Sequence, residues 1–144
     1  MKSLRRMSAA FVLLIVLLSG CGLSPSVGTG SDFAVSAQND ALSVNLSSKQ
    51  VAELYRHGYV VIVDVRQAWE YEDVHVEDSI LIPLDELPER TDEVPTDQPV
   101  ILLCRSGNRS GQAIRLLENA GFDNVHNLVG GITAWEQQGY PVVR

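Results

Sequence analysis

Short apolar runs recur along the second half of the chain and predict buried β-strands. Residues 100–103 are continuously apolar, as are residues 59–63, which suits strands that are buried on both faces of a parallel sheet. Residues 43–46 predict a short first strand, and residues 125–128 predict the last one. Residues 74–82 are expected to supply one further short strand.

Segments with helical spacing separate these strands. Ser47 and Gln50 form a capping-box pattern that predicts the start of the first helix. Apolar residues at helical spacing predict two more helices, over residues 110–120 and 132–138. Alternating strands and helices of this kind predict an α/β domain over residues 43–144, with a mainly parallel central sheet flanked by helices on both faces.

The segment before the apolar run at residues 100–103 has weaker secondary-structure signals. Residues 83–87 predict the start of a short helix, and residues 89–97, which are rich in acids, predict a solvated loop that Pro88, Pro95 and Pro99 punctuate. We therefore expect this segment to connect strands rather than to carry chemistry.

One loop combines a thiol with two guanidinium groups. Cys104 directly follows the predicted strand 100–103, and a predicted helix begins a few residues later. In open α/β sheets ligands bind at the carboxyl ends of strands, and a helix start offers unpaired N–H groups to an anion. Beside these groups and the arginines, we expect the Cys104 thiol to have a lowered pKa and to act as a thiolate nucleophile. The loop therefore predicts an anion-binding active site with contacts from Arg105, Ser106, Gly107, Asn108 and Arg109.

Charged residues also follow the predicted strand 59–63. Asp64 and Arg66 would lie at the same edge of the sheet as Cys104 if the two strands are parallel. Arg66 and Glu70 are spaced to meet on a helical turn. We expect Asp64, Arg66 and Glu70 to support the site, with a structural ion pair favoured over direct substrate contact for Arg66 and Glu70.

The first twenty residues have the layout of a secretory signal. Lys2, Arg5 and Arg6 precede an apolar stretch at residues 7–18, which is too short to span a bilayer comfortably. Small residues then lead to Cys21, an arrangement that resembles a bacterial lipobox. The resemblance implies that residues 1–20 are a signal peptide and that Cys21 becomes a diacylglycerol-modified N-terminus. The alternatives are an uncleaved membrane anchor, or ordinary secretion with Cys21 as a free thiol.

Residues 21–42 are rich in serine, glycine and other small residues, and they predict a flexible tether. Signal removal takes away three basic residues and no acid, so the formal net charge of −7 becomes −10 in the mature protein. An acidic body argues against nucleic-acid binding and against electrostatic adhesion to a membrane. We therefore expect the lipid alone to attach the protein to a bacterial membrane. The protein is expected to be a monomer and to lie outside the cytoplasm.

The remaining titratable residues predict no metal site and no cofactor. The three histidines at positions 57, 75 and 126 are far apart and have no neighbouring cysteine, whereas a zinc site needs three or four ligands. If Cys21 is lipidated, Cys104 is the only free thiol. An intramolecular disulfide is then excluded, and a two-cysteine oxidoreductase loses support.

The sequence Cys-Arg-Ser-Gly-Asn-Arg-Ser at residues 104–110 resembles the active loop of single-domain rhodaneses, the sulfurtransferases. Residues 61–66, followed by Glu70 and Tyr71, agree with that family, as does the segment Asn-Leu-Val-Gly-Gly-Ile-Thr-Ala-Trp at residues 127–135. The resemblance covers about residues 44–142. It departs from the family pattern at Asp78, which stands where the family usually has glycine.

The resemblance implies covalent catalysis by double displacement. Cys104 would attack the outer sulfur of thiosulfate or a similar small anion, release sulfite and carry the sulfur as a persulfide, which cyanide or a small thiol would then remove. Arg105 favours an oxyanion donor. A non-catalytic persulfide carrier or protein-docking module is the second hypothesis, and a cysteine phosphatase is the third. The C-x4-R spacing from Cys104 to Arg109, one residue shorter than in the related phosphatases, disfavours the last.

Overall fold

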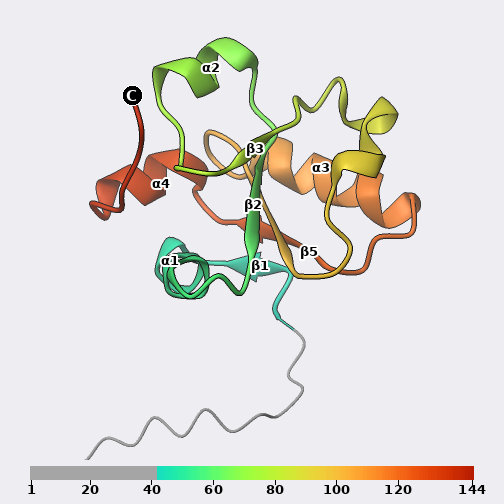
Figure 1. The fold of residues 1–144 in the computed structure, drawn as a ribbon, viewed down its shortest axis with the longest axis horizontal. Helices are drawn as coiled ribbons and strands as arrows, with labels where there is room; N and C mark the ends of the chain where they lie inside the picture. The colour runs from blue at the N-terminus through green and yellow to red at the C-terminus, as the bar shows by residue number, and fades with distance from the viewer. Residues whose placement is uncertain (1–41) are drawn as a thin grey trace, which may run out of the picture. The chain divides into compact units, whose positions relative to one another are not determined.

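The computed structural model describes residues 42–144, in which five parallel strands form one sheet in the order β1-β5-β4-β2-β3 (Figure 1). The strands are β1 (Asn45–Leu46), β2 (Val61–Asp64), β3 (Ile80–Leu81), β4 (Val100–Leu103) and β5 (Val125–Leu128). The predicted α/β class and the parallel sheet are therefore confirmed. The predicted signal peptide, the lipid site at Cys21 and the tether, apart from Leu42, lie outside the described residues.

Helices cover both faces of this sheet. In Figure 1, α1 (Ser48–Arg56) and α4 (Gly131–Gln137) lie to one side of the strands, and α3 (Asn108–Asn119) lies to the other. The capping box at the start of α1 is formed as expected, because the backbone N–H of Gln50 donates to Ser47 Oγ and the backbone N–H of Ser47 donates to Gln50 Oε1.

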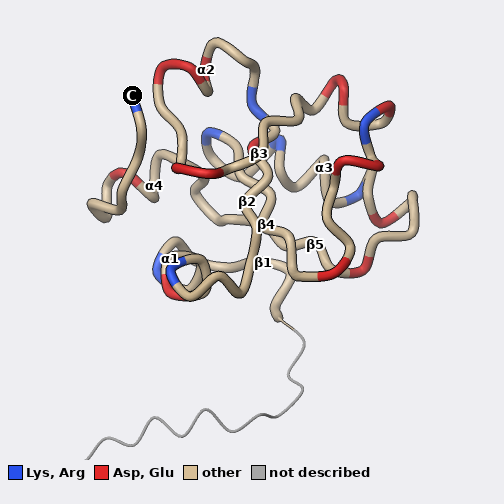
Figure 2. Tube along the Cα trace, viewed as in Figure 1, with Lys and Arg blue, Asp and Glu red and all other residues tan. Residues whose placement is uncertain are grey.

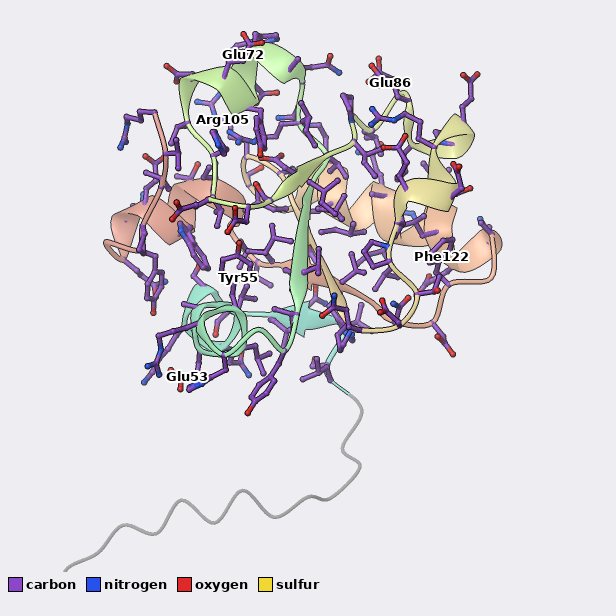
Figure 3. All side chains as sticks on the ribbon, in the orientation of Figure 1. Glu53, Tyr55, Glu72, Glu86, Arg105 and Phe122 are labelled. Carbon is purple, nitrogen blue, oxygen red and sulfur yellow. The ribbon has the colours of Figure 1, made fainter. Side chains whose placement is uncertain are left out.

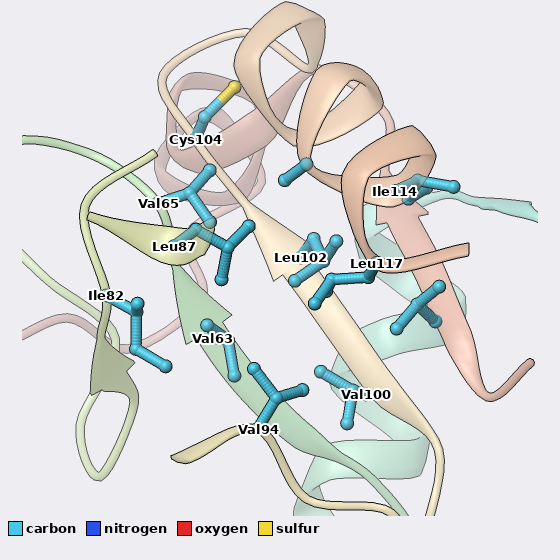
Figure 4. Close-up of a cluster of buried hydrophobic side chains, with 12 residues drawn as sticks. Val63, Val65, Ile82, Leu87, Val94, Val100, Leu102, Cys104, Ile114 and Leu117 are labelled. Atoms are coloured by element: carbon cyan, nitrogen blue, oxygen red, sulfur yellow. The ribbon is translucent and has the colours of Figure 1, made fainter. Parts of the chain in front are cut away.

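Strand β4 supplies side chains to two separate core clusters. Val100 and Leu102 pack with the apolar face of α3, whereas Ile101 and Leu103 pack with α1 and α4. Figure 4 shows the first cluster, with Cys104 at the end nearest the start of α3. Burial on both faces explains why the sequence of this strand is apolar at every position.

The register of the sheet places the ends of β2 and β4 level with each other. Val61 pairs with Val100 and Asp64 pairs with Leu103, so both strands end at the same edge. The residues that follow β2 therefore lie beside the residues that follow β4, as the sequence predicted.

The segment between residues 74 and 94 differs most from its prediction. Only Ile80–Leu81 pairs as β3, because His75 forms an antiparallel bridge with Val143 and a tight turn follows, with Asp78 at φ 57°. The segment expected to start a short helix, residues 83–87, forms a turn that leads into a single 3-10 turn and no α-helix. The N–H of Leu84 donates to the carbonyl of Val65, which holds this segment against the end of β2 as a turn.

Single 3-10 turns at Leu87–Glu89 (η1) and Thr91–Glu93 (η2) follow. The acidic loop is less solvated than expected, since Val94 is buried in the core. A short helix that the sequence did not clearly signal, α2 (Ala68–Asp73), lies after β2. None of the helices in residues 42–144 has the length and apolar character needed to cross a bilayer.

Candidate active site

The loop between β4 and α3 is held in place by the start of α4. The backbone N–H of Ile132 donates to the carbonyl of Cys104 at 2.8 Å, and the N–H of Thr133 donates to the carbonyl of Arg105 at 3.2 Å. Gly131 makes this approach possible, because a Cβ atom at that position would lie only 2.2 Å from the Cys104 carbonyl oxygen. Gly131 thus allows the start of α4 to hold the Cys104 loop.

The sulfur of Cys104 is surrounded by hydrogen-bond donors. The side chain is almost fully buried, with its sulfur directed at the first turn of α3 (Figure 4). The N–H of Gly107 lies 3.0 Å from Sγ, and the hydroxyl of Ser110 lies 3.4 Å from it. Gly107 has a φ of 102°, a left-handed conformation that turns its N–H back toward the sulfur. The geometry suits a sulfur atom that carries negative charge.

The pKa of the Cys104 thiol is below its ordinary value. Burial alone raises the pKa, but hydrogen bonds from the Ser110 hydroxyl and from the N–H groups of Ser110, Ser106 and Gly107 outweigh that effect. The direction matches the prediction, and the N–H groups of the loop and the helix start contribute as expected. The main stabilisation comes from hydrogen bonds rather than from the charges of the two arginines.

Arg109 is bound to a carboxylate of α2. Its Nη1 and Nη2 atoms donate to the two oxygens of Glu70 at 2.6 and 2.8 Å. The hydrogen bond from Arg109 is the largest effect on Glu70 and holds the pKa of that carboxyl below its usual value. Glu70 also accepts from the N–H of Gln67 at the start of α2. This ion pair fastens α2 to the beginning of α3.

Arg66 does not form the expected contact with Glu70. It forms an ion pair with Asp64, the last residue of β2. Arg66 Nε donates to both oxygens of Asp64 at 2.9 Å, and Arg66 Nη2 donates to Asp64 Oδ2 at 2.5 Å. Both side chains are buried. The second Nη2 hydrogen bond, to the carbonyl of Val74, ties the end of β2 to the segment that follows α2. The pair rigidifies the edge of the sheet on which the site is built.

Burial raises the pKa of the Asp64 carboxyl, and the hydrogen bonds from Arg66 oppose that rise. An ion pair at this depth stabilises only when each charge keeps its hydrogen bonds, and here the carboxylate accepts four of them. Asp64 and Arg66 are thus structural partners two residues apart, where the sequence spacing had pointed to Glu70.

Arg105 is the exposed cation of the loop. Its side chain makes no hydrogen bond or ion pair within residues 42–144, and Figure 3 shows it beneath α2. Together with Trp69, Asp73 and Glu136 it lines a cleft of about 320 Å³ between α2, the loop and α4. Ser106 and Asn108 are also exposed. A larger cavity of about 400 Å³, between α1 and the C-terminal segment, contains no residue of the loop.

Three site residues were not predicted from the sequence. Ser110 contacts the sulfur, Asn127 of β5 accepts a hydrogen bond from Ser110, and Gly131 admits the loop carbonyls. All three lie inside the two motifs on which the family resemblance rested, residues 104–110 and 127–135. A search for reactive side chains alone passes over them, because a serine, an asparagine and a glycine carry no distinctive chemistry until their neighbours are known.

Comparison with known proteins identifies relatives of this domain. The family model for the rhodanese-like domain matches residues 47–138. A protein named sulfurtransferase from Allochromatium vinosum is 40% identical over 84 residues, which is 58% of this chain and 78% of that protein. A protein named thiosulfate sulfurtransferase GlpE from Actinobacillus pleuropneumoniae is 30% identical over 97 residues, or 67% of this chain and 90% of that protein.

A solved structure has the same fold. The rhodanese-related protein from Thermoplasma volcanium is 31% identical, with a TM-score of 0.65, and the match covers 70% of this chain and 98% of that one. Coverage varies among the relatives, since this chain spans only 60% of the length of a curated relative from Synechocystis that is 32% identical over 108 residues.

Proposed function

The chain belongs to the rhodanese-like domain family, and from that premise we propose that it is a sulfurtransferase whose nucleophile is Cys104. The observation that carries the proposal is the position of the Cys104 sulfur, which lies 3.0 Å from the Gly107 N–H in a loop that presents further N–H groups and one exposed arginine. An anionic sulfur fits this environment both as a thiolate and as the terminal atom of a persulfide.

The proposed donor is thiosulfate or a similar sulfane-sulfur anion. The Cys104 thiolate attacks the outer sulfur, a new S–S bond forms at Sγ, and the S–S bond of thiosulfate breaks so that sulfite leaves with the electron pair. Arg105 is assigned to the oxyanion of the donor, because its guanidinium group is exposed at the mouth of the loop while that of Arg109 is held by Glu70. The name of the Actinobacillus relative supports this choice of donor.

In the second half of the reaction an acceptor takes the sulfur. A thiophilic nucleophile, cyanide or a small thiol, attacks the outer sulfur of the persulfide and restores the Cys104 thiolate. Cyanide becomes thiocyanate, and a thiol becomes a persulfide. Stabilisation of the leaving thiolate by the Gly107 N–H and the Ser110 hydroxyl lowers the barrier to this step.

Two assays run side by side test the proposal. The protein is expected to release sulfite from thiosulfate in the presence of cyanide, to lose this activity in Cys104→Ser, and to leave aryl phosphates intact. Hydrolysis of aryl phosphates without sulfite release would overturn the sulfurtransferase assignment in favour of a phosphatase. If neither activity is seen and a stable persulfide can be isolated on Cys104, the protein is a carrier instead.

The cellular setting is also part of the proposal. Residues 1–21 have the layout of a lipoprotein signal ending in Cys21, and we propose that the mature protein is held by a lipid on that cysteine to the outer side of a bacterial membrane. The sulfurtransferase domain would then act outside the cytoplasm, on donors present there.

A further inference from the structure

A line of polar side chains connects Cys104 to the edge strand of the sheet. Cys104 Sγ lies 3.4 Å from Ser110 Oγ, Ser110 Oγ lies 2.7 Å from Asn127 Oδ1, and Asn127 Nδ2 lies 2.9 Å from Asn45 Oδ1. Ser110 is fully buried at the start of α3, and Asn127 and Asn45 are register partners in β5 and β1. The line crosses from the catalytic loop to a residue that is exposed at the surface.

The hydroxyl proton of Ser110 cannot serve both of its neighbours at once. A serine hydroxyl has one donor and two acceptor positions. Ser110 Oγ lies within hydrogen-bond distance of both Asn127 Oδ1, at 2.7 Å, and Cys104 Sγ, at 3.4 Å. When the sulfur is a protonated thiol, the Ser110 proton goes to the nearer amide oxygen, which can only accept. Ser110 Oγ then offers Cys104 a lone pair, which suits a protonated thiol that donates to it.

A charged sulfur needs the opposite arrangement. The thiolate can only accept, so the Ser110 proton must turn toward Sγ, and Asn127 must then present a donor to Ser110 Oγ. A primary amide can do this because it carries a donor and an acceptor, and a half-turn of the side-chain amide exchanges them. A matching half-turn of Asn45 presents its NH₂ group to Asn127 Oδ1, so each hydrogen bond in the line is reversed and none is lost.

We propose that Asn127 is a positioning residue that sets the direction of the hydrogen-bond line Cys104–Ser110–Asn127–Asn45. In one direction the line accepts from a thiol, and in the other it donates to the anionic sulfur. The proposal rests on the proposed function only in taking Cys104 as the nucleophile that alternates between these forms. The position requires a side chain with both a donor and an acceptor, as the asparagine amide has, because a carboxylate accepts in both orientations and a hydrocarbon does neither.

The first test replaces Asn127 with an acceptor alone. In Asn127→Asp the Ser110 proton stays on the carboxylate, so the thiolate loses its hydroxyl donor. The pH profile of iodoacetamide labelling, followed at the Cys104 peptide by mass spectrometry in the full chain, is expected to shift upward by about one to two pH units, the size of one charge-assisted hydrogen bond. An unchanged profile would overturn the proposal.

In Asn127→Asp the new negative charge also raises the pKa of Cys104 directly through space. Repeating the substitution in the Ser110→Ala variant separates this direct effect from the effect of the hydrogen-bond line. In Ser110→Ala the line is cut next to the sulfur, so adding Asn127→Asp there is expected to produce less than half of the shift measured in the wild-type background. Equal shifts in the two backgrounds would show that Asn127 acts by proximity alone and would overturn the proposal.

Asn45→Asp provides a variant that does not disturb the interior. Asn45 is exposed, and a carboxylate there keeps Asn127 Nδ2 as its donor, which leaves the Asn127 oxygen facing Ser110. We expect an upward shift of about half to one pH unit, whereas Asn119→Asp, an exposed position at the end of α3, leaves the profile unchanged. No shift in Asn45→Asp would contradict a line that reaches β1. Alkylation needs no sulfur donor, so a failed sulfurtransferase assay leaves this test intact.

Discussion

Arg105 and Arg109 stand four residues apart in one loop, but they have different surroundings. Arg109 uses Nη1 and Nη2 to bind Glu70, while Arg105 is exposed beside the cleft between α2 and α4. A guanidinium that already has a bidentate carboxylate partner has less capacity for a substrate anion. Arg105 is therefore the better candidate for recognition of the donor, and Arg109 the better candidate for a structural role.

Arg105→Ala tests this division of roles. We expect the KM for thiosulfate to rise by about ten- to a hundredfold, the size of one hydrogen bond to a charged group, while discharge of a preformed persulfide to cyanide changes little. Steady-state and single-turnover rates measure the two halves separately. Arg115→Ala, which removes an exposed charge from the outer side of α3, serves as the control and should leave both rates unaltered.

The pair between Glu70 and Arg109 predicts a specific dependence of stability on pH. The folded-state pKa of Glu70 is lowered by its hydrogen bond from Arg109, so the pair contributes stability above the ordinary value of 4.5 and loses it as the pH falls through the lower folded value. Glu70→Gln should reduce the free energy of unfolding at pH 7 by about 1 kcal/mol, and this deficit should shrink in acid.

Urea unfolding at a series of pH values from 7 downward measures the difference. Glu72→Gln is the matched control, because Glu72 is exposed on the same helix and makes no ion pair among residues 42–144, so its effect should stay within about 0.5 kcal/mol. A deficit in Glu70→Gln that is independent of pH would mean that the pair acts by packing and not by charge.

Asp78 marks a turn whose conformation the sequence alone did not predict. The sequence marked it as a departure from the family glycine, and the structure gives it a φ of 57°, the left-handed conformation that glycine adopts most easily. Aspartate is among the few other residues that tolerate this conformation. The turn is thus retained with a different residue, an outcome that depends on backbone geometry and could not be read from side-chain chemistry.

At the scale of elements, the start of α4 holds the Cys104 loop through two hydrogen bonds. Gly131→Ala should reduce the free energy of unfolding by about 3 kcal/mol and lower sulfurtransferase activity, because φ is 58° and the added Cβ would collide with the carbonyls of Cys104 and Arg105. Thermal unfolding followed by circular dichroism, with sulfite release assayed on the same samples, measures both effects.

Gly139→Ala isolates the backbone contribution. Gly139 also has a positive φ, of 74°, but no atom lies within 4 Å of the position that its Cβ would take. Its cost should be about 1 kcal/mol, with activity retained. Similar losses in the two variants would contradict the close approach at Gly131.

The elements that the sequence predicted well are those with a single strong cause. Burial on both faces made β4 continuously apolar, and the capping box marked the start of α1. The region from α2 to η2 was predicted poorly, because its conformation is set by distant partners. Leu84 is held by the carbonyl of Val65, and His75 pairs with Val143, near the far end of the chain. Local patterns contain no record of such contacts.

In the candidate site, too, some features were predicted from local sequence and others depend on distant contacts. Cys104 and its loop were identified because thiol, guanidinium and glycine occur together between a strand and a helix. The pairing of Arg66 with Asp64 was missed, since helical spacing pointed to Glu70 while the side chain turned back along β2. The alternation of elements indicated a parallel sheet, but the order of its strands, which brings Asn127 to Ser110, needs the three-dimensional structure.

At the scale of the whole molecule, the charge is distributed over the surface of an acidic domain. Figure 2 shows acids along α2 and along the segment between β3 and β4, with basic residues between them. The full chain carries a formal net charge of −7, and the first twenty residues contribute only positive charge. Electrostatic repulsion from an anionic membrane therefore opposes binding, and attachment would depend on a lipid.

Cys21→Ser tests the proposed anchor. Expressed in a bacterial host with lipoprotein processing, the wild-type protein should fractionate with membranes and incorporate labelled palmitate, and the variant should incorporate none and leave the membrane fraction after signal cleavage. Cys104→Ser is the control for loss of a cysteine and should label as the wild type does. Palmitate incorporation into Cys21→Ser would refute the assignment of the lipid site.

The N–H groups that hold the carbonyls of Cys104 and Arg105 belong to residues 132 and 133, near the end of the chain. A chain that stops before residue 130 lacks both donors, so we expect its Cys104 loop to lose this support. Loss of the C-terminal segment would therefore disturb the loop without removing any residue that contacts the sulfur.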